Sequence, residues 1–237
     1  MQAIIHKANT RGHADHGWLN SYHSFSFAGF YDPEKVHFGA LRVLNDDSVA
    51  AGMGFGKHPH DNMEIISIPL EGDLEHGDDM GNKAVIRKGD VQIMSAGTGV
   101  VHSEKNHSSK DAVKFLQIWV FPNKKNVPPR YDQKSFTDGQ MKNKWLTVVS
   151  PIGNSEGVNI HQDAWFSLGR LDVGTTLKYD LKKKGNGLYA FILEGDVKIQ
   201  DVELNRRDGL GISDANSVEV KAVSNAHVLL MEIPMLN

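Results

Sequence analysis

A short apolar run that ends in a charged turn lies at residues 63–73, which read Met-Glu-Ile-Ile-Ser-Ile-Pro-Leu-Glu-Gly-Asp. A similar run returns at residues 188–196, which read Leu-Tyr-Ala-Phe-Ile-Leu-Glu-Gly-Asp, so that the Leu-Glu-Gly-Asp turn repeats at an offset of 123. Phe121-Pro122 and Ile233-Pro234 then close the two copies at an offset of 112. We interpret this as an internal duplication in which the second copy has the shorter loops.

Further short runs rich in β-branched and aromatic residues lie between clusters of glycine and aspartate, a pattern typical of strands. The runs are Met63–Leu70, Val85–Met94, Val113–Phe121, Leu188–Leu193, Val218–Val223 and His227–Ile233. No long stretch shows the sustained apolar spacing and the caps of an amphipathic helix. The sequence therefore predicts an all-β protein with few short helices, built as two antiparallel β-barrels in one chain.

The duplication also predicts the domain bounds. Residues 1–122 should form an N-terminal barrel and residues 161–237 a C-terminal barrel. The segment 123–160 between them holds Pro128-Pro129, Asp138-Gly139 and Pro151, which favour turns, so we expect an irregular connector there.

Composition excludes several classes of protein. The 237 residues carry a formal charge of −3, and the longest basic run is Lys182–Lys184, so we expect no direct binding of nucleic acid. No stretch approaches the length of a membrane span, and the first residues lack the apolar core of a signal peptide, which favours a cytoplasmic protein. Because there is no cysteine, any metal must be held by nitrogen and oxygen atoms.

Histidines point to a metal site in the first copy. Ten of the 12 lie in residues 1–122. His58-Pro-His60 places two imidazoles on one face of a strand, and His102-Ser-Glu104 repeats this i, i+2 spacing after a glycine-rich bend. A single His-x-His is more often a surface or hydrogen-bonded pair, but two such pairs on neighbouring strands would form a four-ligand site.

Strand parity also brings in a second carboxylate, and the offsets of the duplication give a prediction for the second copy. Glu64 continues the parity of His58 and His60, together with Ile66 and Ile68, so it also faces inward in this interpretation. By the offsets, the four candidate ligands correspond to Leu181, Lys183, Val220 and Ala222, and we expect no metal there. The remaining histidines of the first half with no partner pattern, namely His13, His16, His76 and His107, should be solvated or hydrogen-bonded.

At these residues the chain resembles a known family. The pattern from Gly52 through His58, His60 and Glu64 to Gly72 is similar to a first cupin motif, and Gly89 through His102 to a second. More specifically, the chain resembles the pirin family in Ser24–Pro33, Leu41–Asp47, His58–His60, Leu70–Gly72, Gly81–Asn82 and Met94–Glu104. The resemblance covers most of the first half, whereas the second half is similar to the family only in layout.

The resemblance implies a bicupin with one mononuclear metal held by His58, His60, His102 and Glu104. The general cupin pattern would offer Glu64 instead; we prefer Glu104 because the pirin-like His-Ser-Glu triplet is intact. Three imidazoles and one carboxylate suit a divalent transition ion and leave two octahedral positions open. The resemblance favours Fe(II), although Zn, Cu, Mn and Ni match the same donors.

The resemblance further implies quercetin 2,3-dioxygenase activity, in which a flavonol is opened by O₂ with release of carbon monoxide. Glu104 would then accept the substrate hydroxyl proton as well as bind the ion. Ile66 and Ile68, with Phe25 or Phe27 at the mouth, would receive a flat aromatic substrate, while core packing is the simpler explanation of both phenylalanines. The alternative is a redox-responsive regulator that binds a protein partner, and in either case we expect a monomer.

Overall fold

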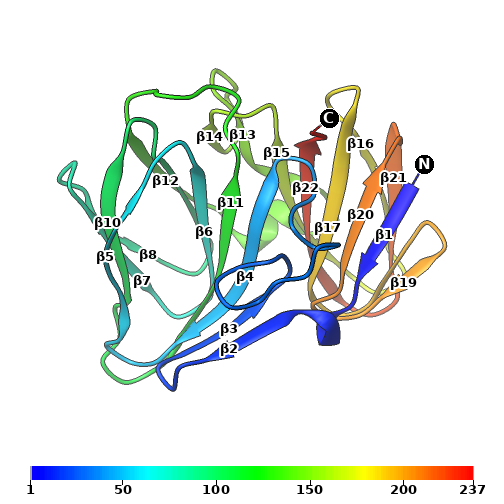
Figure 1. Cartoon of the computed structure of the whole chain (residues 1–237). Helices are drawn as coiled ribbons and strands as arrows, with labels where there is room; N and C mark the ends of the chain where they lie inside the picture. The colour runs from blue at the N-terminus through cyan, green and yellow to red at the C-terminus, as the bar shows by residue number, and fades with distance from the viewer. Residues whose placement is uncertain (1, 237) are drawn as a thin grey trace.

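The computed structural model describes residues 2–236, which form two β-barrels that lie side by side (Figure 1). Within this range the helical segments are two short 3-10 turns, η1 (Ala8–Thr10) and η2 (Asp138–Met141). The predicted all-β, two-barrel architecture is confirmed. Across the described residues no helix is long and apolar enough to cross a membrane.

The N-terminal barrel is formed by a seven-stranded and a four-stranded sheet. In spatial order the larger sheet consists of β12 (Arg130–Ser135), β9 (Asp90–Ser95), β6 (Glu64–Glu71), β11 (Val113–Val120), β4 (Leu41–Val49), β3 (Leu19–His23) and β2 (Gly12–Asp15). The smaller sheet consists of β5 (Gly54–His60), β10 (Val100–Asn106), β7 (Leu74–Asp78) and β8 (Lys83–Ile86). All of these strands pair antiparallel.

The C-terminal barrel repeats this layout. Its larger sheet consists of β1 (Gln2–His6), β20 (Gly209–Ser213), β17 (Asn186–Glu194), β22 (Ala226–Pro234), β15 (Trp165–Leu171), β13 (Leu146–Pro151) and β14 (Val158–Ile160). Its smaller sheet consists of β16 (Thr176–Asp180), β21 (Ser217–Ala222), β18 (Val197–Ile199) and β19 (Val202–Leu204). The repeated turns match in detail, since Gly72 and Gly195 both have positive φ, of 73° and 77°, which favours glycine.

The strand pairing crosses the predicted domain bounds at both places. Strand β1 belongs to the first copy by sequence, yet it pairs with β20 of the C-terminal sheet. The segment 123–160, expected to be irregular, contains β12 on the N-terminal sheet and β13 and β14 on the C-terminal one. The first copy therefore supplies one edge strand to the C-terminal sheet, and the connector supplies an edge strand to each of the larger sheets. The bounds at residues 122 and 160 stay a prediction.

The two barrels share one apolar core between their larger sheets, which face each other at the centre of the molecule (Figure 1). It contains Ile66 and Leu116 from one barrel and Phe166 and Leu229 from the other, all fully buried. The barrel interiors differ. The C-terminal one is mostly apolar, with a buried Glu232 that accepts a hydrogen bond from Tyr179, whereas the N-terminal one has two small apolar clusters with a polar layer between them.

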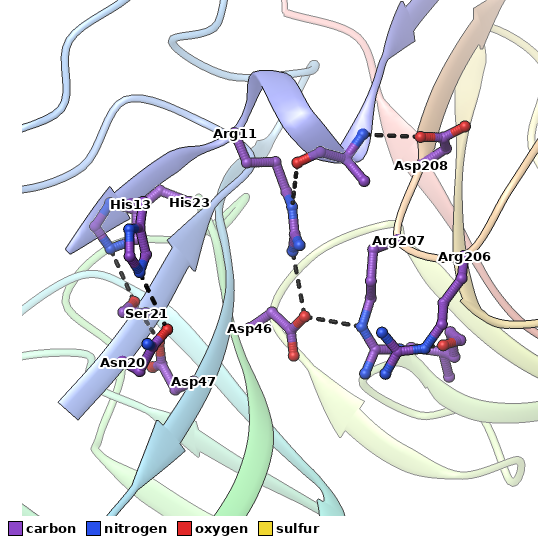
Figure 2. A network of polar contacts seen from close by, with 12 residues as sticks. Arg11, His13, Asn20, Ser21, His23, Asp46, Asp47, Arg206, Arg207 and Asp208 are labelled. Carbon is purple, nitrogen blue, oxygen red and sulfur yellow. Dashed lines mark hydrogen bonds and ion pairs between the residues drawn. The ribbon is translucent and has the colours of Figure 1, made fainter. Parts of the chain in front are cut away.

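A buried ion triad of Arg11, Asp46 and Arg207 links the two barrels beside this core. The carboxylate of Asp46 on β4 accepts hydrogen bonds from Arg11 at 3.2 Å and from Arg207 of the C-terminal barrel at 2.8 Å (Figure 2). The three side chains are only 8%, 15% and 8% exposed for Arg11, Asp46 and Arg207. The two buried guanidinium groups thus share the Asp46 carboxylate, and Arg207 also lies 4.0 Å from Glu194.

We expect Asp46→Asn to destabilise the protein by about 3–5 kcal/mol, because removing one member of a buried ion cluster leaves uncompensated charge. Urea unfolding followed by circular dichroism measures this loss. As a control, Glu71→Gln removes the partner of Lys114 at a well-exposed ion pair, and its midpoint should stay close to wild type. Equal midpoints for the two variants would contradict the structural role of the triad.

His227 on β22 lines a cavity of about 430 Å³ between the barrels, and its Nε2 has no hydrogen-bond partner among the described residues. Burial lowers the pKa of His227 to about 3. His227 therefore takes up a proton near pH 6.5 in the unfolded chain but only near pH 3 in the folded protein. The free energy of unfolding consequently falls as the pH drops from 6.5 toward 3.

Between pH 7 and pH 5, we expect the free energy of unfolding of His227→Phe to fall by about 2 kcal/mol less than that of wild type. The reason is that each pKa unit in this window is worth ~1.4 kcal/mol. Urea titrations at both pH values test this. A His227→Phe variant as acid-sensitive as wild type would contradict the prediction.

Candidate metal centre

Strands β5 and β10 bring three predicted ligands together. His58 and His102 are direct cross-strand partners, and His60 follows His58 on the same face of β5. The ring centroids lie 4.4 Å apart for His58 and His102, 4.9 Å for His58 and His60, and 5.0 Å for His60 and His102. One nitrogen from each ring lies within 4.8 Å of the other two, so the three can meet one ion.

The protonation states suit metal binding. Both ring nitrogens of His102 are buried without a hydrogen-bond partner among the described residues, which is costly unless a ligand satisfies them. His58 Nδ1 donates to the Gly56 carbonyl at 2.7 Å, and this tautomer leaves Nε2 as a free donor to a metal. Burial, helped by the neighbouring imidazoles, lowers the pKa of His60 to about 4 and that of His102 to about 3. Both rings are thus neutral near pH 7 and fit a divalent ion.

Glu104 lies beside this cluster but outside the group of three mutually close ligand atoms. Its side chain is 2% exposed, and its carboxylate accepts hydrogen bonds from Ser67 Oγ at 2.8 Å and Gln117 Nε2 at 2.5 Å. Burial raises the pKa of Glu104, while these donors and the charge of nearby histidines oppose the rise. Ligation by Glu104 stays a prediction, and the structure places the carboxylate at the edge of the site.

The predicted inward face of β6 is wrong. Asn62, with φ of 45°, turns the chain between β5 and β6, so the parity of His58 does not continue into the next strand. Ile66 and Ile68 belong to the core between the barrels. Glu64 accepts a hydrogen bond from Ser95 at 2.7 Å and another from the backbone of His161, across the connector. Glu64 therefore points away from the histidine cluster.

Strand pairing also corrects the predicted equivalences in the second copy by two residues. Leu74 pairs with Asn106 after the first Leu-Glu-Gly-Asp turn, as Val197 pairs with Ala222 after the second. This register makes Val218 the counterpart of His102 and Val220 that of Glu104, and Tyr179 pairs with Val218 as His58 pairs with His102. Leu181 then corresponds to His60. The four corrected positions, Tyr179, Leu181, Val218 and Val220, still offer no imidazole or carboxylate.

Other histidines have the predicted hydrogen bonds. His13 contacts Asn20 at 3.2 Å, and His107 contacts Glu75 at 3.0 Å. His76 is buried, lies 2.9 Å from Asp78, and has its ring 5.5 Å from that of His102. His76 thus lies next to His102 and packs beside the histidine cluster, which its sequence context did not predict.

A pocket of about 530 Å³ opens beside the cluster, within the size range of small-molecule sites. Strand β5 provides one wall with His58 and His60, and β2 to β4 provide the other. Phe27 and Trp119 form an aromatic pair in the pocket, with their rings edge to face at 5.5 Å. Phe25, the other candidate for the mouth, is fully buried in the core. No sequence pattern indicated the polar residues of the second wall, which are Ser21, His23, Asn45 and Asp47.

Two fused barrels of this topology, with a histidine cluster and an adjoining pocket in only one copy among the described residues, define a bicupin metal protein. The pirin family model matches residues 5–120, and the model described as the quercetinase C-terminal cupin domain matches residues 147–233. Together with the full-length relatives below, these matches show that the chain belongs to the pirin family.

Full-length relatives agree with this assignment. The chain is 42% identical over 230 residues to a quercetin 2,3-dioxygenase of Escherichia coli K12, covering 97% of this chain and 98% of that protein. The crystal structure of YhhW from Escherichia coli superposes with a TM-score of 0.94 at 41% identity, covering 100% of this chain and 99% of that one. A structure of bacterial pirin YhhW in complex with nickel(II), also from Escherichia coli, gives 0.93 at 40% identity, covering 99% and 100%.

Proposed function

We propose that this protein is a metal-dependent dioxygenase that opens a flavonol such as quercetin with O₂ and releases carbon monoxide. The observation that carries this proposal is the position of three imidazoles that can meet one ion, with unsatisfied nitrogens on His102, beside a pocket of about 530 Å³. The quercetin 2,3-dioxygenase of Escherichia coli, 42% identical over nearly the whole chain, supports the same activity here.

His58, His60 and His102 would hold one divalent ion, with Glu104 as the fourth ligand. The ion, Fe(II) in our proposal, supplies Lewis acidity that favours the deprotonated form of a substrate oxygen. The hydrogen bond from His58 to Gly56 fixes that ring, and the surrounding β10 pairing fixes His102. The protein thus presents a preformed set of donors rather than one that must assemble around the substrate.

Glu104 would accept the hydroxyl proton as the flavonol binds. A carboxylate held by Ser67 and Gln117 is fixed in place, and its burial makes it a stronger base than an exposed glutamate. Proton transfer then neutralises a buried negative charge, which is favourable at a site so poorly solvated.

The pocket fits a flat aromatic substrate. Phe27 and Trp119 offer aromatic edges and faces, and Trp18 packs edge to face on Phe55 of β5 at 5.4 Å. Such surfaces bind planar rings and exclude water from the reacting centre. The protein would therefore orient the substrate by stacking while the histidine end fixes its oxygens.

The proposal is tested with protein purified without an affinity tag. Metal content is measured first, and O₂ uptake and carbon monoxide release are then followed with quercetin, against the same concentration of free metal in buffer. Equal molar consumption of O₂ and release of carbon monoxide, well above the free-metal rate, is the expected result. Activity no higher than free metal would reject the enzyme and favour the redox-responsive regulator.

A further inference from the structure

A row of polar side chains crosses the inner face of the larger N-terminal sheet. Cross-strand pairing aligns His23 on β3 with Asn45 on β4, Asn45 with Gln117 on β11, Gln117 with Ser67 on β6, and Ser67 with Gln92 on β9. Direct cross-strand partners point to the same face, so this row forms the polar layer between the two apolar clusters. All five side chains are at least nine-tenths buried.

The corresponding layer of the C-terminal barrel is mostly apolar. There the pairing aligns Ser167, Leu230, Ala190 and Leu210 across β15, β22, β17 and β20. Since both copies fold into the same barrel, the polar row is not required by the architecture. Burying polar groups costs free energy unless they are hydrogen-bonded. The unpaired atoms of the row in the N-terminal barrel therefore need hydrogen-bond partners.

Acceptors without a partner lie at both ends of the row, at Gln92 Oε1 outside the pocket and on β3 and β4 beside it. Ser21, His23, Asn45 and Asp47, which we call the polar wall, all line the pocket. His23 Nδ1 and Asn45 Oδ1 are buried with no hydrogen-bond partner among the described residues. The wall comes from β3 and β4, whereas His58 and His60 line the same pocket from β5.

Hydrogen bonding within the wall makes it rich in acceptors. Ser21 Oγ donates to Asp47 Oδ1 and contacts His23 Nε2 at 2.8 Å (Figure 2). Because the Ser21 hydroxyl proton is used on Asp47, His23 must donate from Nε2, which leaves Nδ1 as an acceptor. His23 Nδ1 and Asn45 Oδ1 are thus two buried acceptors without a donor among the described residues.

We propose that the polar wall binds a hydroxyl group of the substrate other than the one that meets the metal, so that His23 and Asn45 select, among flat aromatic substrates, those with further hydroxyls. This inference rests on the proposed function for the orientation of the substrate. Phenolic hydroxyls are good donors carried on a flat ring, and they match both the acceptors of the wall and the aromatic sides of the pocket. An apolar ring at the wall would leave the buried acceptors unpaired, which costs ~1–3 kcal/mol.

The test compares quercetin, which has further hydroxyls on both ring systems, with 3-hydroxyflavone, which has only the 3-hydroxyl. Equilibrium binding to the metal-free and the Zn(II)-loaded protein is followed without O₂ by quenching of tryptophan fluorescence, since Trp119 lies in the pocket. Wild type should bind quercetin on the order of 10-fold or more tightly than 3-hydroxyflavone, and Asn45→Leu or His23→Leu should shrink that ratio at least about 5-fold. Gln92→Leu is the matched control, because Gln92 is an equally buried amide of the same row outside the pocket.

The outcomes separate this inference from the activity. A wild-type ratio near one, unchanged ratios in both wall variants, or an equal change in Gln92→Leu would each overturn the inference even if quercetin is consumed. Discrimination that depends on Asn45 and His23 in a protein without turnover would uphold the inference and reject the dioxygenase. Using two wall variants guards against a single misfolded protein, and the ratio cancels any loss of active material.

Discussion

Replacing His102 by alanine is expected to reduce bound metal from about one ion per chain to less than a tenth of that, with activity falling in parallel. His102 lies at the centre of the cluster, within 4.4 Å and 5.0 Å of the His58 and His60 rings by centroid, and its two nitrogens have no other partner among the described residues. Removing it leaves two imidazoles and an off-centre carboxylate, which bind a divalent ion weakly. Elemental analysis after dialysis against buffer without chelator measures the loss.

His58→Ala should behave in the same way, whereas His107→Ala should keep wild-type metal, because His107 is exposed and paired with Glu75 at 3.0 Å. Anomalous scattering from crystals of the wild type should place the ion in the N-terminal barrel. Near-full occupancy in both site variants would refute the ligand assignment, and an ion within residues 161–237 would refute the prediction for the second copy.

The sequence was informative wherever a signal was local. Strand geometry alone was enough to predict that the i, i+2 pairs ending at His60 and Glu104 point to one face. The Leu-Glu-Gly-Asp turn identified the duplication because Gly72 and Gly195 must adopt positive φ. Parity failed at Asn62, where a single turn separates two strands that belong to different sheets. A one-residue change of phase reverses every later side chain, which is why Ile66 was placed in the wrong layer.

Pairing between strands far apart in the sequence determined the position of β1 and the composition of the polar wall. The exchange of β1 onto the C-terminal sheet joins Ile4 to Gly211, and no sequence pattern near either residue indicates a partner so distant. The polar wall likewise combines His23 and Asn45, which are ordinary residues of two separate strands until the register aligns them beside the pocket. Three-dimensional contact, rather than composition, gives these residues their role.

The role of Glu104 in proton transfer predicts a difference between metal binding and turnover. Glu104→Gln should keep most of the metal, which three histidines still hold, yet lower kcat by on the order of 10²–10⁴, because an amide cannot act as a general base. The variant should fold, since the Ser67 hydroxyl can reverse its hydrogen bond to accept from the new amide while Gln117 continues to donate.

The matched control for this experiment is Glu64→Gln, which alters a buried carboxylate that also accepts a hydrogen bond from a serine but faces away from the histidines. Both variants are assayed at equal metal occupancy, with O₂ uptake and carbon monoxide measured against quercetin. Glu64→Gln should retain activity within a few-fold of wild type. If Glu104→Gln does the same, the proton must leave the substrate by another route, and Glu104 acts at most as a ligand. If both variants lose activity together with metal, the carboxylates act through the stability of the barrel, because Glu64 touches the connector at His161 and not the pocket.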